Sequence, residues 1–120
     1  MALNIVGGSV SPSTALSLNA QTGTTYTFVL TDANNTLVTA SNASAQTYTI
    51  PPNSSVAYPI GAQINIIQIG AGQVSFAQGS GVTIASNGAT STAPKLRVQY
   101  SSATAIKVDT DKWYVVGDIV

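Results

Sequence analysis

Residues 63–86 read QINIIQIGAGQVSFAQGSGVTIAS, three runs of β-branched and apolar residues separated by two glycine-containing turns. In the second and third runs, apolar and polar side chains alternate, which is typical of a strand with one buried face. The glycines provide the backbone freedom that tight reversals require. The stretch therefore predicts a meander of three short strands.

The first run, residues 63–69, does not alternate cleanly. Ile64 and Ile66 fall on one face of a strand, whereas Ile67 and Ile69 fall on the other. Either a β-bulge lies near Ile66, or the strand is apolar on both faces. The second interpretation bears on function, because a second apolar face on a small β domain requires a partner to cover it. We therefore treat the four isoleucines as candidate contacts to another subunit or to another protein.

The composition excludes several classes of function. The chain of 120 residues has four basic and four acidic side chains and no cysteine or histidine. Four basic residues are too few for nucleic acid, and without cysteine or histidine neither a zinc site nor a Ser-His-Asp nucleophile can be assembled. No apolar run approaches the roughly 20 residues that span a bilayer. We expect a soluble, non-enzymatic protein, made in the cytoplasm, with no cofactor, metal, nucleic acid or membrane partner.

The chain divides into an N-terminal arm, residues 1–23, and an all-β module, residues 24–120. The arm begins with Leu3, Ile5 and Val6, and flexible glycines and a proline follow; residues 16–19 alternate as a short strand would. Two interpretations remain open. The arm is either a frayed terminus or a segment that orders on a neighbouring subunit and buries its three apolar side chains there.

The module is predicted to be a small single-domain β-sandwich or barrel. About nine short strands follow one another with turn signals between them, and neither a helical period nor a repeat of fixed length is present. Residues 25–30 and 36–41 are predicted to form a hairpin. Residues 95–100 alternate most cleanly, so Leu96, Val98 and Tyr100 are expected to face the core.

Two clusters could carry chemistry. Asp109 and Asp111 form the one close carboxylate pair, but calcium requires six to eight oxygen ligands, so a plain turn is the stronger interpretation. Tyr100, Trp113 and Tyr114 could form an aromatic platform for a sugar ring; alternatively, Trp113 is simply the largest residue of the core.

From about Thr24 onward the chain resembles a module of tailed-bacteriophage virion proteins. The likeness is carried, in order, by TIPPNSSVAYPIG (residues 49–61), GAGQV (70–74), GVTI (81–84), LR (96–97) and WYVVGD (113–118). In that family the module commonly belongs to larger tail or fibre proteins, and virion proteins of this kind are often trimers. Only the short arm precedes the module here, so the resemblance implies a capsid decoration protein rather than a long fibre.

The sequence therefore predicts a virion structural protein, specifically a decoration (cement) protein on the capsid surface. It is expected to form a homotrimer and to bind the major capsid protein. The candidate contact residues are Leu3, Ile5, Val6, Ile64, Ile66, Ile67 and Ile69. The alternative is a phage fibre or receptor-binding module that recognises host carbohydrate through Tyr100, Trp113 and Tyr114.

Overall fold

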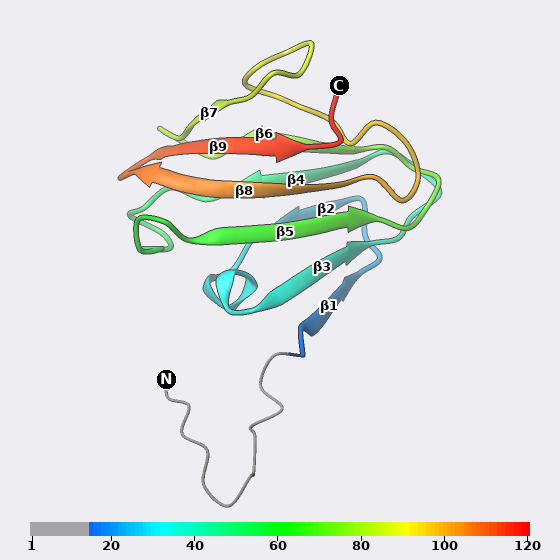
Figure 1. Ribbon diagram of the computed structural model, residues 1–120, viewed down its shortest axis with the longest axis horizontal. Coiled ribbons are helices and arrows are strands. Elements are labelled where there is room, and N and C mark those ends of the chain that lie inside the picture. Colours follow the sequence, from blue (N-terminus) through cyan, green and yellow to red (C-terminus); the bar gives the residue numbers. More distant parts are fainter. Residues whose placement is uncertain (1–14) are drawn as a thin grey trace, which may run out of the picture.

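The computed structural model describes residues 15–120, and these form an all-β domain of two sheets that face each other (Figure 1). The strands in this range are β1 (Ser17–Gln21), β2 (Thr25–Thr27), β3 (Thr36–Ala40), β4 (Gln46–Ile50), β5 (Gln63–Gln68), β6 (Val74–Gln78), β7 (Thr83–Ala85), β8 (Ser102–Asp109) and β9 (Lys112–Gly117). One short 3-10 helix, η1 (Leu30–Ala33), follows β2. No helix in residues 15–120 is long and apolar enough to cross a membrane.

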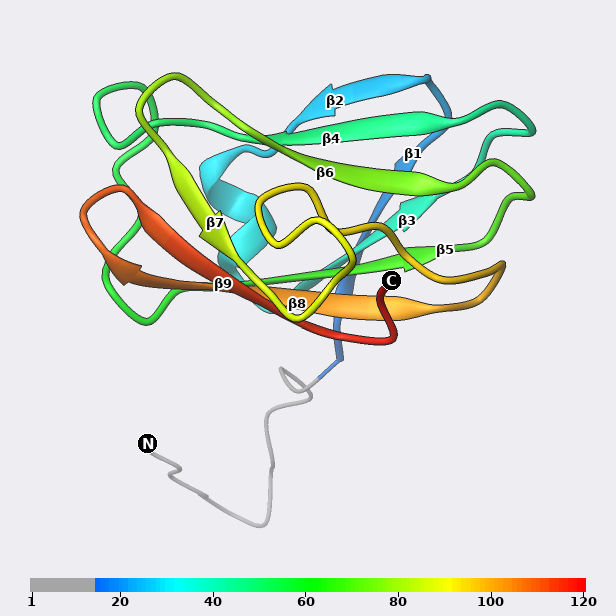
Figure 2. The ribbon, with the colours of Figure 1, turned by 90° about the horizontal axis from the view of Figure 1, so that it is seen from above.

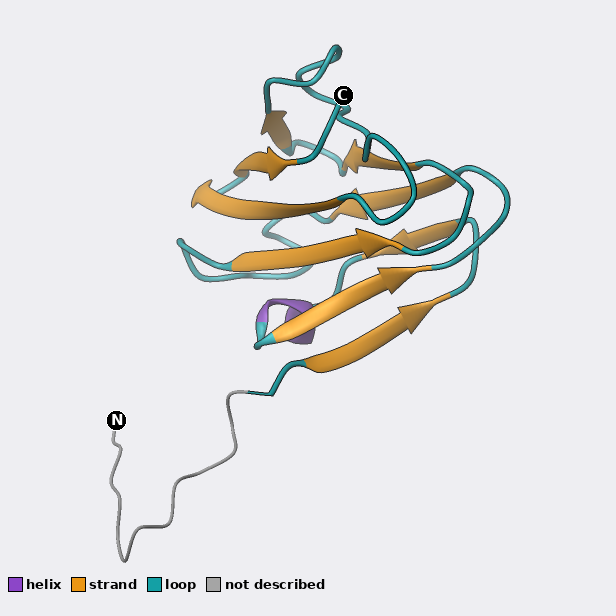
Figure 3. Ribbon diagram, turned by 45° about the vertical axis from the view of Figure 1, so that its right-hand side comes forward, coloured by secondary structure: helices purple, strands orange, loops and turns teal. Residues whose placement is uncertain are grey.

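The first six strands alternate between the two sheets. The six-stranded sheet has the order β1-β3-β5-β8-β9-β7, and the three-stranded sheet has the order β2-β4-β6. Strands β1, β3 and β5 are parallel to one another, as are β2, β4 and β6 (Figures 2 and 3). The chain therefore winds as three coils of a parallel two-sheet helix, after which the antiparallel β8–β9 hairpin extends the larger sheet.

This winding overturns two expectations on strand pairing. Residues 25–30 and 36–41 do not form a hairpin, because β2 and β3 belong to different sheets. Residues 63–86 do not form a meander either, since β5 and β7 belong to one sheet and β6 to the other. Alternation and turn residues look the same whether a chain reverses within a sheet or crosses to the opposite one. Pairing is decided by the stacking of successive coils.

The turns of successive coils lie directly on one another. The Asn42 side chain donates to the Thr22 carbonyl at 2.7 Å, and the Gly72 N–H donates to the Asn42 carbonyl at 2.8 Å. A Cβ atom on Gly72 would lie 1.8 Å from the Ser44 carbonyl oxygen. Glycine is required here by the close approach of two backbones.

Inward-facing side chains of both sheets form one core. Tyr26, Tyr48 and Phe76 occupy equivalent positions of β2, β4 and β6, and the rings of Tyr26 and Tyr48 lie 5.6 Å apart. Opposite them, Ile64 and Ile66 of β5 are fully buried. Similar side chains from successive coils therefore lie next to one another, and aromatic rings fill part of the space between the sheets.

Two buried glutamines satisfy the backbone where the chain crosses between sheets. The Gln68 side chain accepts the N–H of Val74 at 3.0 Å and donates to the Gly70 carbonyl at 3.2 Å. The Gln46 side chain donates to the Gly72 carbonyl at 3.2 Å. These bonds pair polar groups that would otherwise be buried without partners.

Residues 95–100 do not form the strand that their alternation predicts. Lys95 and Leu96 make only isolated bridges, to Ser75 and Ile119. Leu96 is buried as expected, whereas Val98 and Tyr100 are exposed. The physical reason is a turn that takes over at this point, in which the Ser101 N–H donates to the Val98 carbonyl.

The short strand expected at residues 16–19 is present as β1, which pairs with β3 along its whole length. Residues 17–21 therefore belong to the six-stranded sheet, although the sequence places them in the arm. Leu3, Ile5 and Val6 lie outside the described residues.

Candidate interaction surfaces

The first candidate surface is the outer face of the six-stranded sheet, which is turned toward the viewer in Figure 1. One row of paired residues crosses five neighbouring strands of this face: Leu18, Leu37, Asn65, Thr104 and Val116. Leu18 is 70% exposed and Val116 51% exposed. None of the five side chains in the row is charged.

The neighbouring rows of the outer face have the same character. One contains Ala20, Thr39, Ile67 and Ser102, and the other contains Gln63, Ile106, Tyr114 and Ala85. At the end of this face Lys112, the first residue of β9, pairs across a β-bulge with the exposed Asp109, and the Lys112 ammonium lies 5.7 Å from the Tyr114 ring centre. The face thus mixes aliphatic and aromatic side chains with uncharged polar ones, and its exposed apolar members are Leu18, Tyr114 and Val116.

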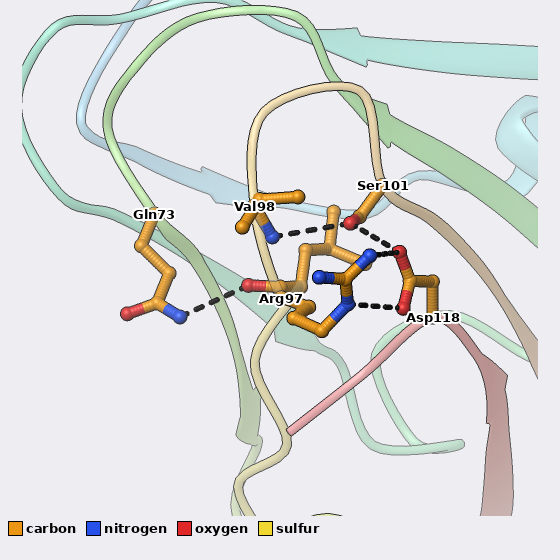
Figure 4. Close-up of polar contacts among 6 residues, drawn as sticks. Gln73, Arg97, Val98, Ser101 and Asp118 are labelled. Atoms are coloured by element: carbon orange, nitrogen blue, oxygen red, sulfur yellow. Dashed lines mark hydrogen bonds and ion pairs between the residues drawn. The ribbon is translucent and has the colours of Figure 1, made fainter.

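The second candidate surface is the loop between β7 and β8, where residues 97–101 are held by an ion pair (Figure 4). Arg97 donates from Nε to Asp118 Oδ1 at 2.8 Å and from Nη2 to Oδ2 at 3.1 Å. Ser101 Oγ donates to Asp118 Oδ2 at 2.6 Å and accepts the N–H of Val98. The hydrogen bonds from Arg97 and then Ser101 hold the pKa of Asp118 below its ordinary value.

The same loop is bonded to the crossing between β5 and β6. Gln99 Nε2 donates to the Ile69 carbonyl at 3.0 Å, and the Tyr100 N–H donates to the Gln68 carbonyl. Gln73 Nε2 donates to the Leu96 carbonyl at 3.0 Å (Figure 4). Side-chain and backbone bonds thus fix the loop from two sides.

The fixed loop displays an exposed aromatic residue in a strained conformation. Tyr100 has a φ of 71°, in the left-handed region that residues other than glycine rarely adopt, and it is 68% exposed. Val98 and Ile69 are also exposed. We call Ile69, Val98 and Tyr100 the Tyr100 knob. Strain of this kind persists where the surrounding structure enforces it, and it is concentrated at functional sites.

The four candidate isoleucines separate into two pairs. β5 keeps a continuous register with both β3 and β8, so no bulge interrupts it. Ile64 and Ile66 face the core and are fully buried, which corrects their assignment as contact residues, because their own chain already covers them. Ile67 faces outward and Ile69 is exposed, so these two remain available to a partner.

The three aromatic residues proposed as a sugar platform do not come together. Trp113 is 1% exposed and packs edge-on against Tyr58, with ring centres 5.2 Å apart. Tyr114, the next residue of the same strand, faces the opposite side, and Tyr100 lies on the loop. Trp113 is a core residue, so its assignment as a candidate sugar contact is wrong. Alternation along β9 already places Trp113 and Tyr114 on opposite faces of the sheet.

The carboxylates of Asp109 and Asp111 bond to the backbone around the β8–β9 turn. Asp109 accepts the N–H of Thr110, and Asp111 accepts the N–H of Asn53 at 2.7 Å. Within residues 15–120 no group of three acidic, histidine or cysteine side chains is close enough to hold a metal ion.

The sequence pattern does not identify Lys107 as a buried residue. Its ammonium donates to Asn53 Oδ1 at 2.6 Å and to the Tyr58 carbonyl at 2.7 Å, and the residue is almost completely buried. The inward positions of β8 are Ala103, Ala105 and Lys107, whereas the larger apolar side chains of this strand point outward. The alternation is visible in the sequence, but apolarity alone would assign the two faces the wrong way round.

A second buried charge ties the first coil together. The Asp32 carboxylate accepts hydrogen bonds from the Asn19 side chain, the Tyr26 hydroxyl and the Val29 N–H, all within 2.9 Å. Burial, together with the hydrogen bond to Asp32, raises the pKa of Tyr26 to about 12. The cluster joins β1, β2 and η1.

A comparison with models of known protein families gives no match for this chain, and no curated protein matches it either.

Proposed function

We propose that this chain is a structural protein of a virion, a capsid decoration (cement) protein that associates with itself and with the lattice of the major capsid protein. The observation that carries the proposal is the uncharged row that crosses five strands of the outer face, with Leu18 and Val116 exposed in it. The apolar members of the row, Leu18, Leu37 and Val116, favour association, because a partner that covers them removes them from water. The Asn65 and Thr104 side chains between them are hydrogen-bonded to each other. The resemblance of residues 49–118 to phage virion modules supplies the virion setting.

The proposed assembly is a homotrimer of small β-sandwich domains on the capsid surface. In this proposal the arm binds through Leu3, Ile5 and Val6, which a capsid subunit or a neighbouring copy covers. Each such side chain contributes roughly 1.5–3 kcal/mol when it is transferred from water to an apolar contact.

The proposal is tested with purified protein and with particles that lack it. Sedimentation at tens of micromolar is expected to give a species larger than a monomer, and mixing with undecorated particles is expected to give saturable binding. A chain that stays monomeric and does not bind the particles would overturn the proposal.

The alternative function is a fibre or receptor-binding module for host carbohydrate. Its aromatic platform is incomplete, since Trp113 lies in the core. A glycan array tests it directly: strong binding of one class of sugar, without particle binding, would replace the decoration role by receptor recognition.

A further inference from the structure

We propose that Lys107 and Asn53 become joined by a covalent amide bond between their side chains, an isopeptide bond, once the chain has folded. The Lys107 Nζ donates to Asn53 Oδ1 at 2.6 Å, so the amine lies against the side-chain amide with which it reacts. The two residues are 54 positions apart in the sequence, so only the folded chain brings them together. This modification does not depend on the proposed role in a virion.

Lys107 is a buried amine without a counter-ion. The residue is 3% exposed, and its second acceptor is the Tyr58 carbonyl, at 2.7 Å. Within residues 15–120 the one ion pair joins Arg97 to Asp118, so no carboxylate in this range is paired with the Lys107 ammonium. A buried charge without an opposite charge beside it costs free energy. Formation of the amide removes this cost, because the product carries no charge.

The two acceptors of the ammonium differ in what an attack by the amine would release. The carbonyl of Tyr58 belongs to the backbone, so substitution at its carbon would cut the chain. The carbonyl of Asn53 belongs to a side-chain carboxamide, whose leaving group is a single small nitrogen. Asn53 is therefore the acceptor at which a lysine amine can act as a nucleophile and leave the chain intact.

The reaction balances without any other reactant. The Lys107 Nζ forms a bond to the Asn53 Cγ, and the bond between Cγ and Nδ2 of Asn53 breaks. Two protons of the Lys107 ammonium pass to the departing nitrogen, which leaves as an ammonium ion. The hydrogen bonds of the Lys107 ammonium thus describe the chain before the reaction.

The backbone holds both reacting residues in place. The Gly61 N–H donates to the Lys107 carbonyl at 2.8 Å, and the Lys107 N–H donates to the Ala62 carbonyl at 3.0 Å. On the other side, the Asn53 N–H donates to the Asp111 carboxylate at 2.7 Å. Two reactive groups that are fixed in contact react far faster than the same groups free in solution.

Buried aromatic rings surround the amine. Trp113 is the partner of Lys107 in the β8–β9 pair, and its ring packs edge-on against Tyr58 with ring centres 5.2 Å apart. Both aromatic residues are almost completely buried, which keeps water from competing with the amine. In a chain without cysteine, this bond takes the place of a disulfide, because it closes a long loop and restricts the unfolded chain.

The mass of the intact protein tests the proposal. We expect the folded wild type to be lighter than its sequence requires by the mass of one ammonia molecule. Lys107→Arg keeps the positive charge but removes the nucleophile, and Asn53→Ala removes the carboxamide, so both variants are expected to have the full mass of their sequences. Lys95→Arg is the matched control, since Lys95 is exposed, and it is expected to lose ammonia as the wild type does.

Digestion of the wild type with trypsin locates the bond, so the test does not depend on the folding of a variant. Trypsin cleaves after lysine and arginine only where the side chain is free, and the chain contains four such residues: Lys95, Arg97, Lys107 and Lys112. With the bond in place, residues 98–112 stay in one piece that is joined to residues 1–95. Without it, residues 98–107 are released as a separate peptide.

Two results would overturn the proposal. A wild type of full mass that releases residues 98–107 would show that Lys107 and Asn53 are hydrogen-bonded only. A loss of ammonia together with release of residues 98–107 would place the loss elsewhere, because a succinimide at another asparagine changes the mass equally. Neither result bears on binding to particles, so the proposed function is tested separately.

Discussion

Lys107 is a buried lysine whose hydrogen bonds connect two distant segments of the chain. Its ammonium donates to Asn53 Oδ1 and to the Tyr58 carbonyl, and so ties residues 51–62 to β8. Lys107→Met keeps much of the side-chain volume but leaves both acceptors without a donor in a buried place. We expect the free energy of unfolding to fall by about 2 kcal/mol, measured by urea denaturation. Lys95→Met, at an exposed position, is the control. An equal loss of unfolding free energy in this variant would contradict the stabilising role of the Lys107 hydrogen bonds.

The strain at Tyr100 predicts an unusual effect of glycine. Because Tyr100 has a φ of 71°, Tyr100→Gly removes the steric cost of the left-handed conformation. We expect the unfolding free energy to rise or to stay within about 1 kcal/mol of wild type, whereas the same change at Tyr114, within β9, lowers it. Chemical denaturation, at protein concentrations too low for self-association, measures the unfolding free energy of both variants. A clear loss of stability in Tyr100→Gly would show that the ring contributes more than the strain costs.

At the scale of elements, the stacked crossings between coils depend on glycine. A Cβ atom on Gly72 would overlap the Ser44 carbonyl, whereas a Cβ atom on Gly23 would lie 3.6 Å from its nearest neighbour. Gly72→Ala must push two backbones apart, so we expect it to destabilise the fold by about 2 kcal/mol or more. Gly23→Ala is expected to be tolerated. Thermal unfolding of the two variants compares them, and equal midpoints would contradict the stacking argument.

The ion pair between Arg97 and Asp118 predicts a pH dependence of stability. Hydrogen bonds from Arg97 and Ser101 hold the pKa of Asp118 below its value in the unfolded chain, about 4. The stabilisation is therefore complete above that unfolded value and is lost as the pH falls through the lower, folded one. At neutral pH we expect the wild type to have a higher melting temperature than Asp118→Asn. The difference between the two melting temperatures is expected to shrink as the pH drops below about 4. A difference between the two proteins that stays constant down to acid pH would contradict this role of the Arg97–Asp118 ion pair.

At the scale of the whole molecule, the arm predicts a separation of folding from attachment. Residues 15–120 form the two sheets and their core, so deletion of residues 1–8 is expected to leave the melting temperature unchanged. The deletion removes Leu3, Ile5 and Val6. Under the proposed attachment, transferring these three side chains out of water contributes more than the roughly 1.4 kcal/mol that changes an affinity tenfold, even after ordering costs. The affinity for undecorated particles, measured as occupancy over a range of protein concentrations, should therefore fall at least tenfold.

Two results would contradict this role of the arm. Unchanged occupancy of the deleted protein would assign attachment to the two-sheet body. A large drop in its melting temperature would instead make the first residues part of the domain's own fold.

The sequence by itself determined the fold class and most strand positions. Period-two alternation and glycine-bearing turns report which segments are extended and where the chain changes direction, and both are local properties. The lack of cysteine and histidine likewise limits the chemistry of the chain, whatever fold it adopts. The divergence of Trp113 and Tyr114 also follows from alternation alone.

Tertiary structure alone decided which strands are neighbours and which faces are covered. A crossing to the opposite sheet uses the same residues as a hairpin, so the parallel coils are decided by contacts between successive coils, such as that of Gly72 with the turn at Ser44. For the same reason the alternation of β5 could not tell which isoleucines the core would take; the opposite sheet covers Ile64 and Ile66 and leaves Ile67 outside. Tyr100 is exposed because a turn, closed by the bond from the Ser101 N–H to the Val98 carbonyl, replaces the strand that alternation predicts. Asp118, distant in the sequence, bonds to Arg97 and Ser101 on either side of this turn.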